Sequence, residues 1–294
     1  MLNNPKVSVC VMTYNHENLI KNCLDSLIHQ KCDFDFEIII GEDCSTDNTR
    51  AIVQDYAKKY PGIVKLLLHE ENVGGEKNYL LVHEAATGEY ICNMDGDDFA
   101  LPGKLQAQAD FMDKTPDCNI AFHRVNYLYP DGSVKEDNIN YQSIKNGFRR
   151  RNLLQYMAVA THSSKMYRKN NRQFEMPDFI VSDFYMNVEQ VLENKAYYIN
   201  DEIYGVYRVG IGQSTQSKDF MKRLVDQTLK FFLLKYPENK AYINALYLLL
   251  LVADIRNYRN PIIHLKGWVR SFSIYSVFLF FKNLDTIKMF KTAK

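Results

Sequence analysis

Hydrophobic and polar positions follow one repeating pattern through the first hundred residues. Short runs that are apolar throughout alternate with stretches whose apolar residues recur at helical spacing. The apolar runs are VSVCVM, FEIII, IVKLLLH and EYICNM, which begin at residues 7, 36, 63 and 89. The helical stretches are 19–28, 51–60 and 77–88. Fully apolar strands that alternate with helices are typical of a parallel sheet with both faces covered, so the pattern predicts an α/β fold.

The pattern changes after residue 98. Residues 102–112 predict another helix, and residues 119–138 predict a hairpin with a Pro-Asp-Gly turn. Three further elements are predicted: a strand at 161–168, a helix at 178–194, and one or two strands at 196–209. From about residue 222 the chain is helical in pattern and rich in Leu, Phe and Tyr. We therefore expect a mixed second half and a helical C-terminal extension.

Polar clusters follow three of the predicted strands, at residues 13–15, 42–43 and 95–98. In a doubly wound sheet, ligands bind in the crevice beyond the carboxyl ends of the strands. The third cluster crowds Asp95, Asp97 and Asp98 into four positions. A divalent cation such as Mg²⁺ or Mn²⁺ would relieve their mutual repulsion and bridge substrate phosphates. An acidic turn that only ends a strand is the alternative, and the three residues alone leave both open.

Composition narrows the class of protein. The chain of 294 residues is 46% hydrophobic and 24% charged, which excludes a disordered or collagenous protein. Its formal net charge of +1 gives no bias toward nucleic acid. The six cysteines show no C-x-x-C spacing, and the first residues show no signal-peptide pattern. We therefore expect reduced thiols and a cytoplasmic location.

Five segments, in this order, resemble the family 2 glycosyltransferases of GT-A fold. The resemblance is dense over residues 6–135 and thinner to about 217. It implies a catalytic domain at 1–220, with a nucleotide-binding half at 1–100 and an acceptor half at 101–220, followed by a helical, basic region at 221–294. The segments are KVSVCVMTYNHENLIKNCLDSLIHQ, FEIIIGEDCSTDNT, ENVGGEKN, ATGEYICNMDGDDFALPGKLQAQADFM and IAFHRVNYLYPDG.

The resemblance also implies a donor site. Asp95-Gly96-Asp97 matches the DxD motif of the family, with Asp97 as the main metal ligand and Asp95 on the metal or the ribose. Asp98 is expected to orient a neighbour or the sugar. Glu42 stands where Asp is more usual, and an N-cap is the alternative role for Asp43. The residues expected to bind the donor are Thr13, Tyr14, Asn15, Asp43, Lys77, Asn78, Asp95 and Gly96.

An inverting transferase needs a base that deprotonates the acceptor hydroxyl. In the family this is an acidic residue at the start of a helix beyond the hairpin, and Asp183 matches that position. Asp178 and Glu189 are competitors that fit less well, and an ordinary helix N-terminal acid is the structural alternative.

Related sequences often carry a histidine on the metal or diphosphate where this chain has Gly210. His123 or His162 could compensate, although a single histidine is more often structural. Tyr207 and Arg208 are expected to shape the diphosphate end.

The last forty residues, 255–294, hold eight basic residues and one acid. The apolar runs at 245–253 and 271–281 are shorter than the roughly 18 residues of a membrane span. Two interpretations of residues 245–294 stay open. They form helices at an anionic bilayer surface, or a helical subdomain that packs on the catalytic core or on a second subunit.

The resemblance implies an inverting, metal-dependent transfer of a hexosyl or hexosaminyl group from a nucleotide-sugar, UDP-linked by expectation, to a saccharide or lipid-linked acceptor. The expected pathway is surface polysaccharide synthesis. Two alternatives remain. A sugar nucleotidyltransferase would release pyrophosphate and carry a glycine-rich loop that TYNHENL lacks. A non-catalytic nucleotide-sugar-binding or assembly subunit would keep the fold without turnover.

Overall fold

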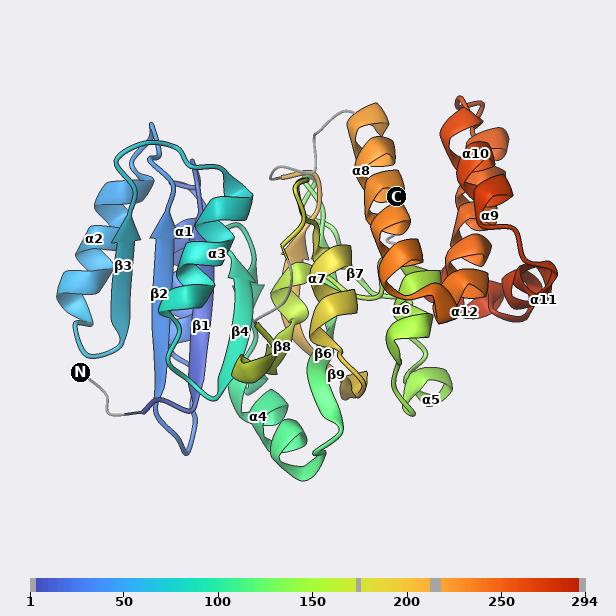
Figure 1. Ribbon diagram of the computed structural model, residues 1–294. Helices are drawn as coiled ribbons and strands as arrows, with labels where there is room; N and C mark the ends of the chain where they lie inside the picture. The colour runs from blue at the N-terminus through green and yellow to red at the C-terminus, as the bar shows by residue number, and fades with distance from the viewer. Residues whose placement is uncertain (1–3, 173–175, 212–217, 291–294) are drawn as a thin grey trace.

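The computed structural model describes residues 4–172, 176–211 and 218–290. A mixed sheet runs through the middle of the molecule, and a set of helices occupies one end (Figure 1). The described strands form a nine-stranded sheet in the order β3-β2-β1-β4-β8-β6-β9-β5, with β7 paired to β6.

The N-terminal half contains the predicted parallel unit. Its strands β3, β2, β1 and β4 pair in parallel. The elements are β1 (Val7–Thr13), α1 (Ile20–Ile28), β2 (Phe36–Glu42), α2 (Thr49–Lys59), β3 (Val64–Leu68), α3 (Gly75–Ala85) and β4 (Tyr90–Asp95). The four apolar runs are therefore confirmed as strands.

Both faces of this unit are covered, as its apolar strands require. One face, with Val9 and Ile38, packs in a core with Leu24 of α1 and Val53 of α2. The other face packs against α3 in a separate core. Because the strands are held from both sides, their carboxyl ends form a fixed edge on which a site can be built.

The middle of the chain extends the sheet with strands of both directions. β8 pairs antiparallel with β4 and β6, whereas β9 runs parallel to β6. The hairpin predicted at 119–138 is confirmed as the antiparallel pair of β6 and β7. The elements are β5 (Phe99–Ala100), α4 (Lys104–Lys114), β6 (Cys118–Leu128), β7 (Val134–Glu136), α5 (Tyr141–Ile144), α6 (Arg150–Tyr156), β8 (Met166–Arg168), α7 (Asp183–Gln190) and β9 (Lys195–Arg208).

Two elements are shorter than the pattern predicts. The strand predicted at 161–168 is reduced to β8, because His162–Ser164 form a 3₁₀ turn before it. The helix predicted from residue 178 begins at Asp183, because Ser182 has an extended backbone at the N-cap position. Both differences place polar side chains beside the end of β4.

Five α-helices and a 3₁₀ turn at Pro237–Asn239 complete the described chain. The α-helices are α8 (Lys218–Lys235), α9 (Lys240–Arg256), α10 (Ile262–Arg270), α11 (Ile274–Lys282) and α12 (Leu284–Met289). α8 joins the core of the sheet through Phe232, whose ring stacks on Tyr185 of α7 at 5.1 Å. No helix among the described residues has the length and apolar character that crossing a membrane requires. The domain boundary at 220/221 stays a prediction.

Candidate active site

The polar clusters predicted at the ends of β1, β2 and β4 lie side by side. Parallel register pairs Thr13 with Glu42 and Met12 with Asp95, so the three loops leave the sheet at one edge. Gly96 comes close to the β1 loop, since a Cβ at this position would lie 2.8 Å from Oγ1 of Thr13 and 2.9 Å from Nδ1 of His16. Only glycine allows this approach.

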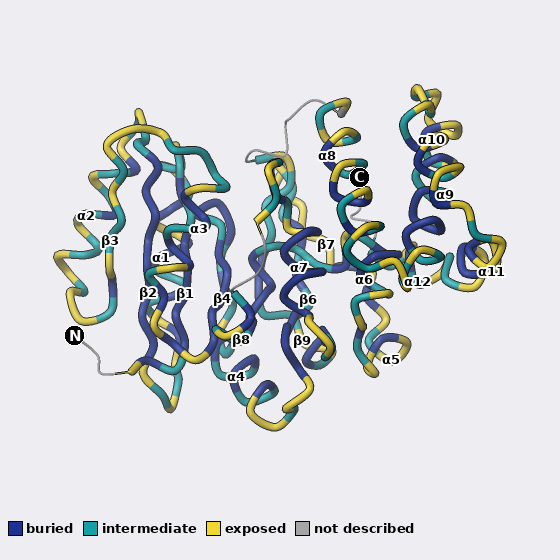
Figure 2. The backbone as a smooth tube through the Cα atoms, in the orientation of Figure 1, coloured by how far each residue is buried: buried dark blue, intermediate teal, exposed yellow. Residues whose placement is uncertain are grey.

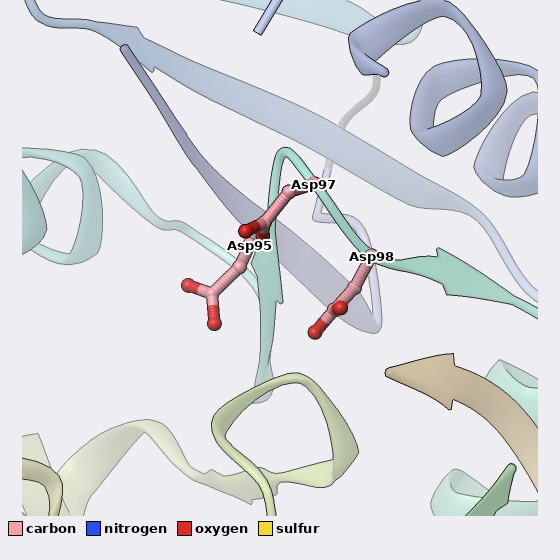
Figure 3. Close-up of side chains that lie close together, drawn as sticks. All are labelled: Asp95, Asp97 and Asp98. Atoms are coloured by element: carbon pink, nitrogen blue, oxygen red, sulfur yellow. The ribbon is translucent and has the colours of Figure 1, made fainter. Parts of the chain in front are cut away.

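The three aspartates form one cluster. A carboxylate oxygen from each lies within 4.8 Å of the others, and the side chains point to the same side of the turn between β4 and β5 (Figure 3). Asp98 is held firmly: Ser163 Oγ donates to it at 2.6 Å and the backbone N–H of Arg208 at 2.9 Å. Asp97 is 8% exposed, and no other residue in the described part of the chain donates a hydrogen bond to its carboxylate.

Burial and mutual repulsion set the protonation of this cluster. Burial, reinforced by the charge of Asp95, raises the pKa of Asp97, and burial with both neighbouring carboxylates raises the pKa of Asp98 well above its usual range. Burial also acts to raise the pKa of Asp95, but the imidazolium of His162 outweighs it and lowers that pKa. Without a cation, burial and mutual repulsion therefore favour proton uptake by Asp97 and Asp98 over three full negative charges.

His162 lies between the cluster and the start of α7. Its Nδ1 is 2.9 Å from Oδ1 of Asp95, and its Nε2 is 3.7 Å from Oδ1 of Asp183. The side-chain amide of Asn93 lies 2.8 Å from Nε2. Burial would lower the pKa of His162, but the two carboxylates raise it to about 9. The ring of His162 thus joins the carboxylate cluster to Asp183.

Asp183 is accessible, whereas Glu189, one of its two competitors, is engaged elsewhere. The Asp183 side chain is 63% exposed at the first turn of α7. Glu189 is buried and accepts hydrogen bonds from Lys235 Nζ at 2.9 Å and the Tyr236 hydroxyl at 3.0 Å. Asp178 is exposed and lies before the helix. Glu189 therefore fastens α8 to α7, and Asp183 is the accessible carboxylate beside His162.

The acidic pair after β2 is built into the loops. Asp43 is buried and accepts the backbone N–H groups of Val73 at 2.7 Å and Gly74 at 3.0 Å, so it does not cap α2. Glu42 is fully buried and accepts from Ser45 N and from Nε of Arg50. Both carboxylates thereby fix the loops that border the crevice.

The other residues expected at the donor differ in accessibility. Asn15, at a positive φ of 54°, is exposed, and its Oδ1 accepts the backbone N–H of Thr46 at 2.8 Å. Lys77 is exposed on α3. Asn78 is 2% exposed, donates to the carbonyl of Gly41 at 3.0 Å, and has Oδ1 3.0 Å from Nε2 of His69. Asn78 thus holds the end of β2, and the donor-binding roles of all three stay predictions.

The residues present fit a divalent cation. Three carboxylates in one turn supply hard oxygen ligands, and Asp97 has capacity left for one. Of the two histidines considered as substitutes, His162 lies at the cluster, whereas His123 is buried with Nδ1 2.8 Å from the carbonyl oxygen of Arg124. Gly210 has a φ of 78°, a conformation that a histidine would adopt only under strain.

Sequence reasoning left the role of His162 open and did not single out Ser163 or His16. Ser163 bridges the cluster from the other half of the sheet, because its Oγ also accepts the backbone N–H of Asp95 at 3.0 Å. No spacing in the sequence predicts this contact, since it depends on the 3₁₀ turn that places His162 and Ser163 beside the end of β4.

Comparison with known proteins gives the family. The profile described as "Glycosyl transferase family 2" matches residues 8–173, more than half of the chain. An uncharacterized protein of Mycobacterium tuberculosis (strain ATCC 25618 / H37Rv) is 37% identical over 128 residues, which cover 43% of this chain and 37% of that protein. The poly(ribitol-phosphate) beta-N-acetylglucosaminyltransferase TarS of Staphylococcus aureus (strain Mu50 / ATCC 700699) is 38% identical over 113 residues, 37% of this chain and 19% of TarS. The chain thus matches well under half the length of these relatives.

Solved structures show the same fold. The crystal structure of S. aureus TarS 1-349 in complex with UDP-GlcNAc has a TM-score of 0.66 at 20% identity, covering 97% of this chain and 81% of that one. The mannosyltransferase PcManGT from Pyrobaculum calidifontis, in complex with GDP-Man and Mn²⁺, has a TM-score of 0.57 at 16% identity, covering 98% and 86%. The predicted GT-A fold with C-terminal helices is confirmed. The chain belongs to glycosyl transferase family 2.

Proposed function

We propose that this protein is an inverting, metal-dependent glycosyltransferase that moves a sugar from a UDP-linked donor to an acceptor hydroxyl in the synthesis of a surface polysaccharide. The observation that carries the proposal is the cluster of Asp95, Asp97 and Asp98, which His162 joins to the accessible Asp183. The TarS and PcManGT complexes support a nucleotide-sugar donor.

Asp97 and Asp95 are the residues that would hold a divalent cation, Mn²⁺ or Mg²⁺. A bound cation would neutralise charge on the diphosphate as it leaves. Asp98 keeps its two hydrogen bonds to Ser163 and Arg208 and fixes the turn that presents the other two carboxylates. The complex of PcManGT with Mn²⁺ supports the choice of cation.

Asp183 serves as the base in this proposal. Its carboxylate accepts the proton of the acceptor hydroxyl, the oxygen forms a bond to the anomeric carbon, and the bond from that carbon to the diphosphate oxygen breaks on the opposite face. The nucleoside diphosphate leaves with the bonding electrons. Because attack and departure occur on opposite faces, the anomeric configuration is inverted. The 63% exposure of Asp183 leaves it open to an acceptor.

His162 positions both ends of the site. Because it lies 2.9 Å from Asp95 and 3.7 Å from Asp183, its imidazolium fixes the orientation of the two carboxylates. In this proposal, the nucleotide side of the same edge is bordered or supported by Thr13, Tyr14, Asn15, Asp43, Gly96, Lys77 and Asn78. Six free cysteines, four of them buried, support a reducing, cytoplasmic location.

The experiment is a turnover assay with purified protein and a panel of UDP- and GDP-sugars, with Mn²⁺ or with a chelator, and with saccharide and lipid-linked acceptors. We expect metal-dependent release of the nucleoside diphosphate from one donor, and NMR of the product should show the inverted anomer. Pyrophosphate release would identify a nucleotidyltransferase instead. Metal-dependent donor binding without turnover on any acceptor would support the assembly-subunit alternative.

A further inference from the structure

Exposed hydrophobic side chains are concentrated at the C-terminal end of the fold. Twelve of the nineteen exposed large hydrophobic side chains in the described part of the chain lie between residues 252 and 281. Figure 2 shows exposed stretches on α10 and α11, at the end of the molecule opposite α2 and β3. A concentration of this kind marks an interaction surface.

The helix α10 leaves several apolar side chains exposed, although its Trp268 packs against the core. It packs His264 and Gly267 against the rest of the protein, and a Cβ on Gly267 would lie 2.0 Å from the ring of Tyr247 in α9. Its apolar residues Leu265 and Val269 are 42% and 61% exposed. In a helix of a water-soluble domain the apolar stripe faces the core, so these exposed apolar residues predict that an apolar medium covers this side.

The turn between α10 and α11 is rigid. Asn244 of α9 is fully buried and donates to the carbonyl of Trp268 at 2.7 Å and to Ser271 Oγ at 2.9 Å. Its Oδ1 accepts from Ser276 Oγ at 2.6 Å and from the backbone N–H of Ser273 at 3.3 Å. The exposed residues around this turn are therefore held in place.

We define the corner patch as the exposed side chains around this turn. The aliphatic members, Val269 and Ile274, are 61% and 83% exposed. The exposed fraction of each aromatic member lies between 50 and 54%. The apolar members are Val269, Phe272, Ile274, Tyr275 and Phe278, and the basic members are Lys266, Arg270 and Lys282.

The charge of the corner patch has one sign. The Lys282 ammonium lies 5.6 Å from the ring of Phe278, so charged and apolar groups are interleaved. The nearest acid in sequence before the patch, Asp254, is buried and paired with Lys222 at 2.9 Å and His264 at 2.7 Å. The next acid after it, Asp285, pairs with Lys288 at 2.8 Å. The patch therefore presents positive charge with no acid of its own to balance it.

We propose that the corner patch binds the surface of an anionic lipid bilayer, with the aromatic and aliphatic side chains in the headgroup region and the lysines and arginine among the lipid phosphates. Interleaved basic and apolar side chains suit such a surface. A two-fold contact between two copies of this patch would bring the same basic residues together without an acid to pair them, so charge complementarity favours lipid. The inference does not depend on the transfer reaction.

The test is co-flotation of the full chain with vesicles of phosphatidylcholine alone or of equal parts phosphatidylcholine and phosphatidylglycerol. We expect binding to the anionic vesicles that weakens as salt rises, and little binding to the neutral ones. The triple variant Lys266→Gln, Arg270→Gln and Lys282→Gln should bind about a hundredfold more weakly, since each charge contributes about fivefold. Val269→Ser with Ile274→Ser and Phe278→Ser should lose at least about tenfold.

Leu234→Ser is the matched control, because Leu234 is 86% exposed on α8 and lies outside the patch. It should bind as the unaltered protein does. All variants should keep the unaltered melting temperature, since the changed side chains are exposed. Absence of binding to anionic vesicles would overturn the proposal. Equal binding by the charge variant and the unaltered protein would also overturn it. A third contradicting result would be self-association in sedimentation that the apolar variant abolishes, with no binding to vesicles.

Discussion

The carboxylate cluster at the end of β4 and the corner patch between α10 and α11 depart from ordinary burial in opposite directions. At the cluster, Asp97 and Asp98 are 8% and 2% exposed, although carboxylates normally face water. At the corner, Ile274 is 83% exposed while Asn244 is fully buried. In the two proposals made above, each arrangement would be relieved by a bound partner, a cation at the cluster and a lipid surface at the corner. Both candidate sites of this protein are therefore marked by side chains whose burial is unusual for their type: buried carboxylates at the cluster and exposed hydrophobic residues at the corner.

The largest expected effect is the loss of turnover when Asp183, the proposed base beside the carboxylate cluster, is replaced. Asp183→Asn should reduce turnover by about 10² to 10⁴-fold, because the amide cannot accept the acceptor proton. Donor affinity, measured separately by calorimetry, should be unchanged, since Asp183 lies beside His162 and not in the cluster. Asp178→Asn is the control, because Asp178 is also exposed but precedes the helix. Equal losses in the two variants would remove Asp183 from the base role.

The second prediction concerns the buried amide of the corner. Asn244→Ala should lower the free energy of unfolding by about 3 kcal/mol, because it leaves several buried partners unsatisfied. Urea denaturation measures this. A change within about 0.5 kcal/mol, the range of ordinary surface substitutions, would mean that the corner is not rigid and would weaken the definition of the patch.

The third prediction concerns how the buried His123 of β6 makes the stability of the protein depend on pH. Burial, with the charge of Lys104, holds the pKa of His123 well below its usual value near 6.5. The neutral folded ring therefore contributes stability above that value, which is lost as the pH falls toward the folded pKa. Between about pH 7.5 and 5.5, the unfolding free energy of the unaltered protein relative to His123→Gln should fall by about 1.4 kcal/mol.

Comparing unaltered protein and variant removes the contributions of the carboxylates, which titrate in both. A difference that stays constant between the two pH values would show that folding does not shift the pKa of His123.

The smallest expected effect is the change in stability when an exposed apolar residue of the corner patch is replaced. Ile274→Ser should change the free energy of unfolding by less than about 0.5 kcal/mol, because the side chain is 83% exposed and has little packing to lose. Thermal melts without vesicles measure this. A clear destabilisation would place Ile274 in a packed interior and remove it from the corner patch.

The sequence was sufficient for the parallel half of the fold, because strands buried on both faces are apolar throughout and leave an unambiguous pattern. It was less informative around His162, where a strand was expected and a 3₁₀ turn lies. That turn depends on contacts with Asp95 and Asp98 from residues more than sixty positions away. Local patterns cannot register such contacts.

The site and the corner show the same limit. Asp95, Asp97 and Asp98 stood out by their spacing, and their cluster is present. The connection from Asp95 through His162 to Asp183 was not visible, because three separate segments build it. In the tail, the apolar run at 271–281 was evident, but its buried side includes the polar Ser276, which bonds to Asn244. Hydrophobicity alone could not tell which residues face outward.

The most direct test of the central claim is calorimetric titration of the purified protein with UDP and UDP-sugars, with and without Mn²⁺, repeated on Asp97→Ala. Within the described residues, Asp97 belongs to the carboxylate cluster, and the other two carboxylates accept hydrogen bonds from His162 and Ser163. We expect nucleotide binding that requires the metal and is lost in Asp97→Ala, while Asp178→Asn binds normally. Nucleotide binding that is equal in Asp97→Ala, or no binding by the unaltered protein with the metal present, would contradict the central claim.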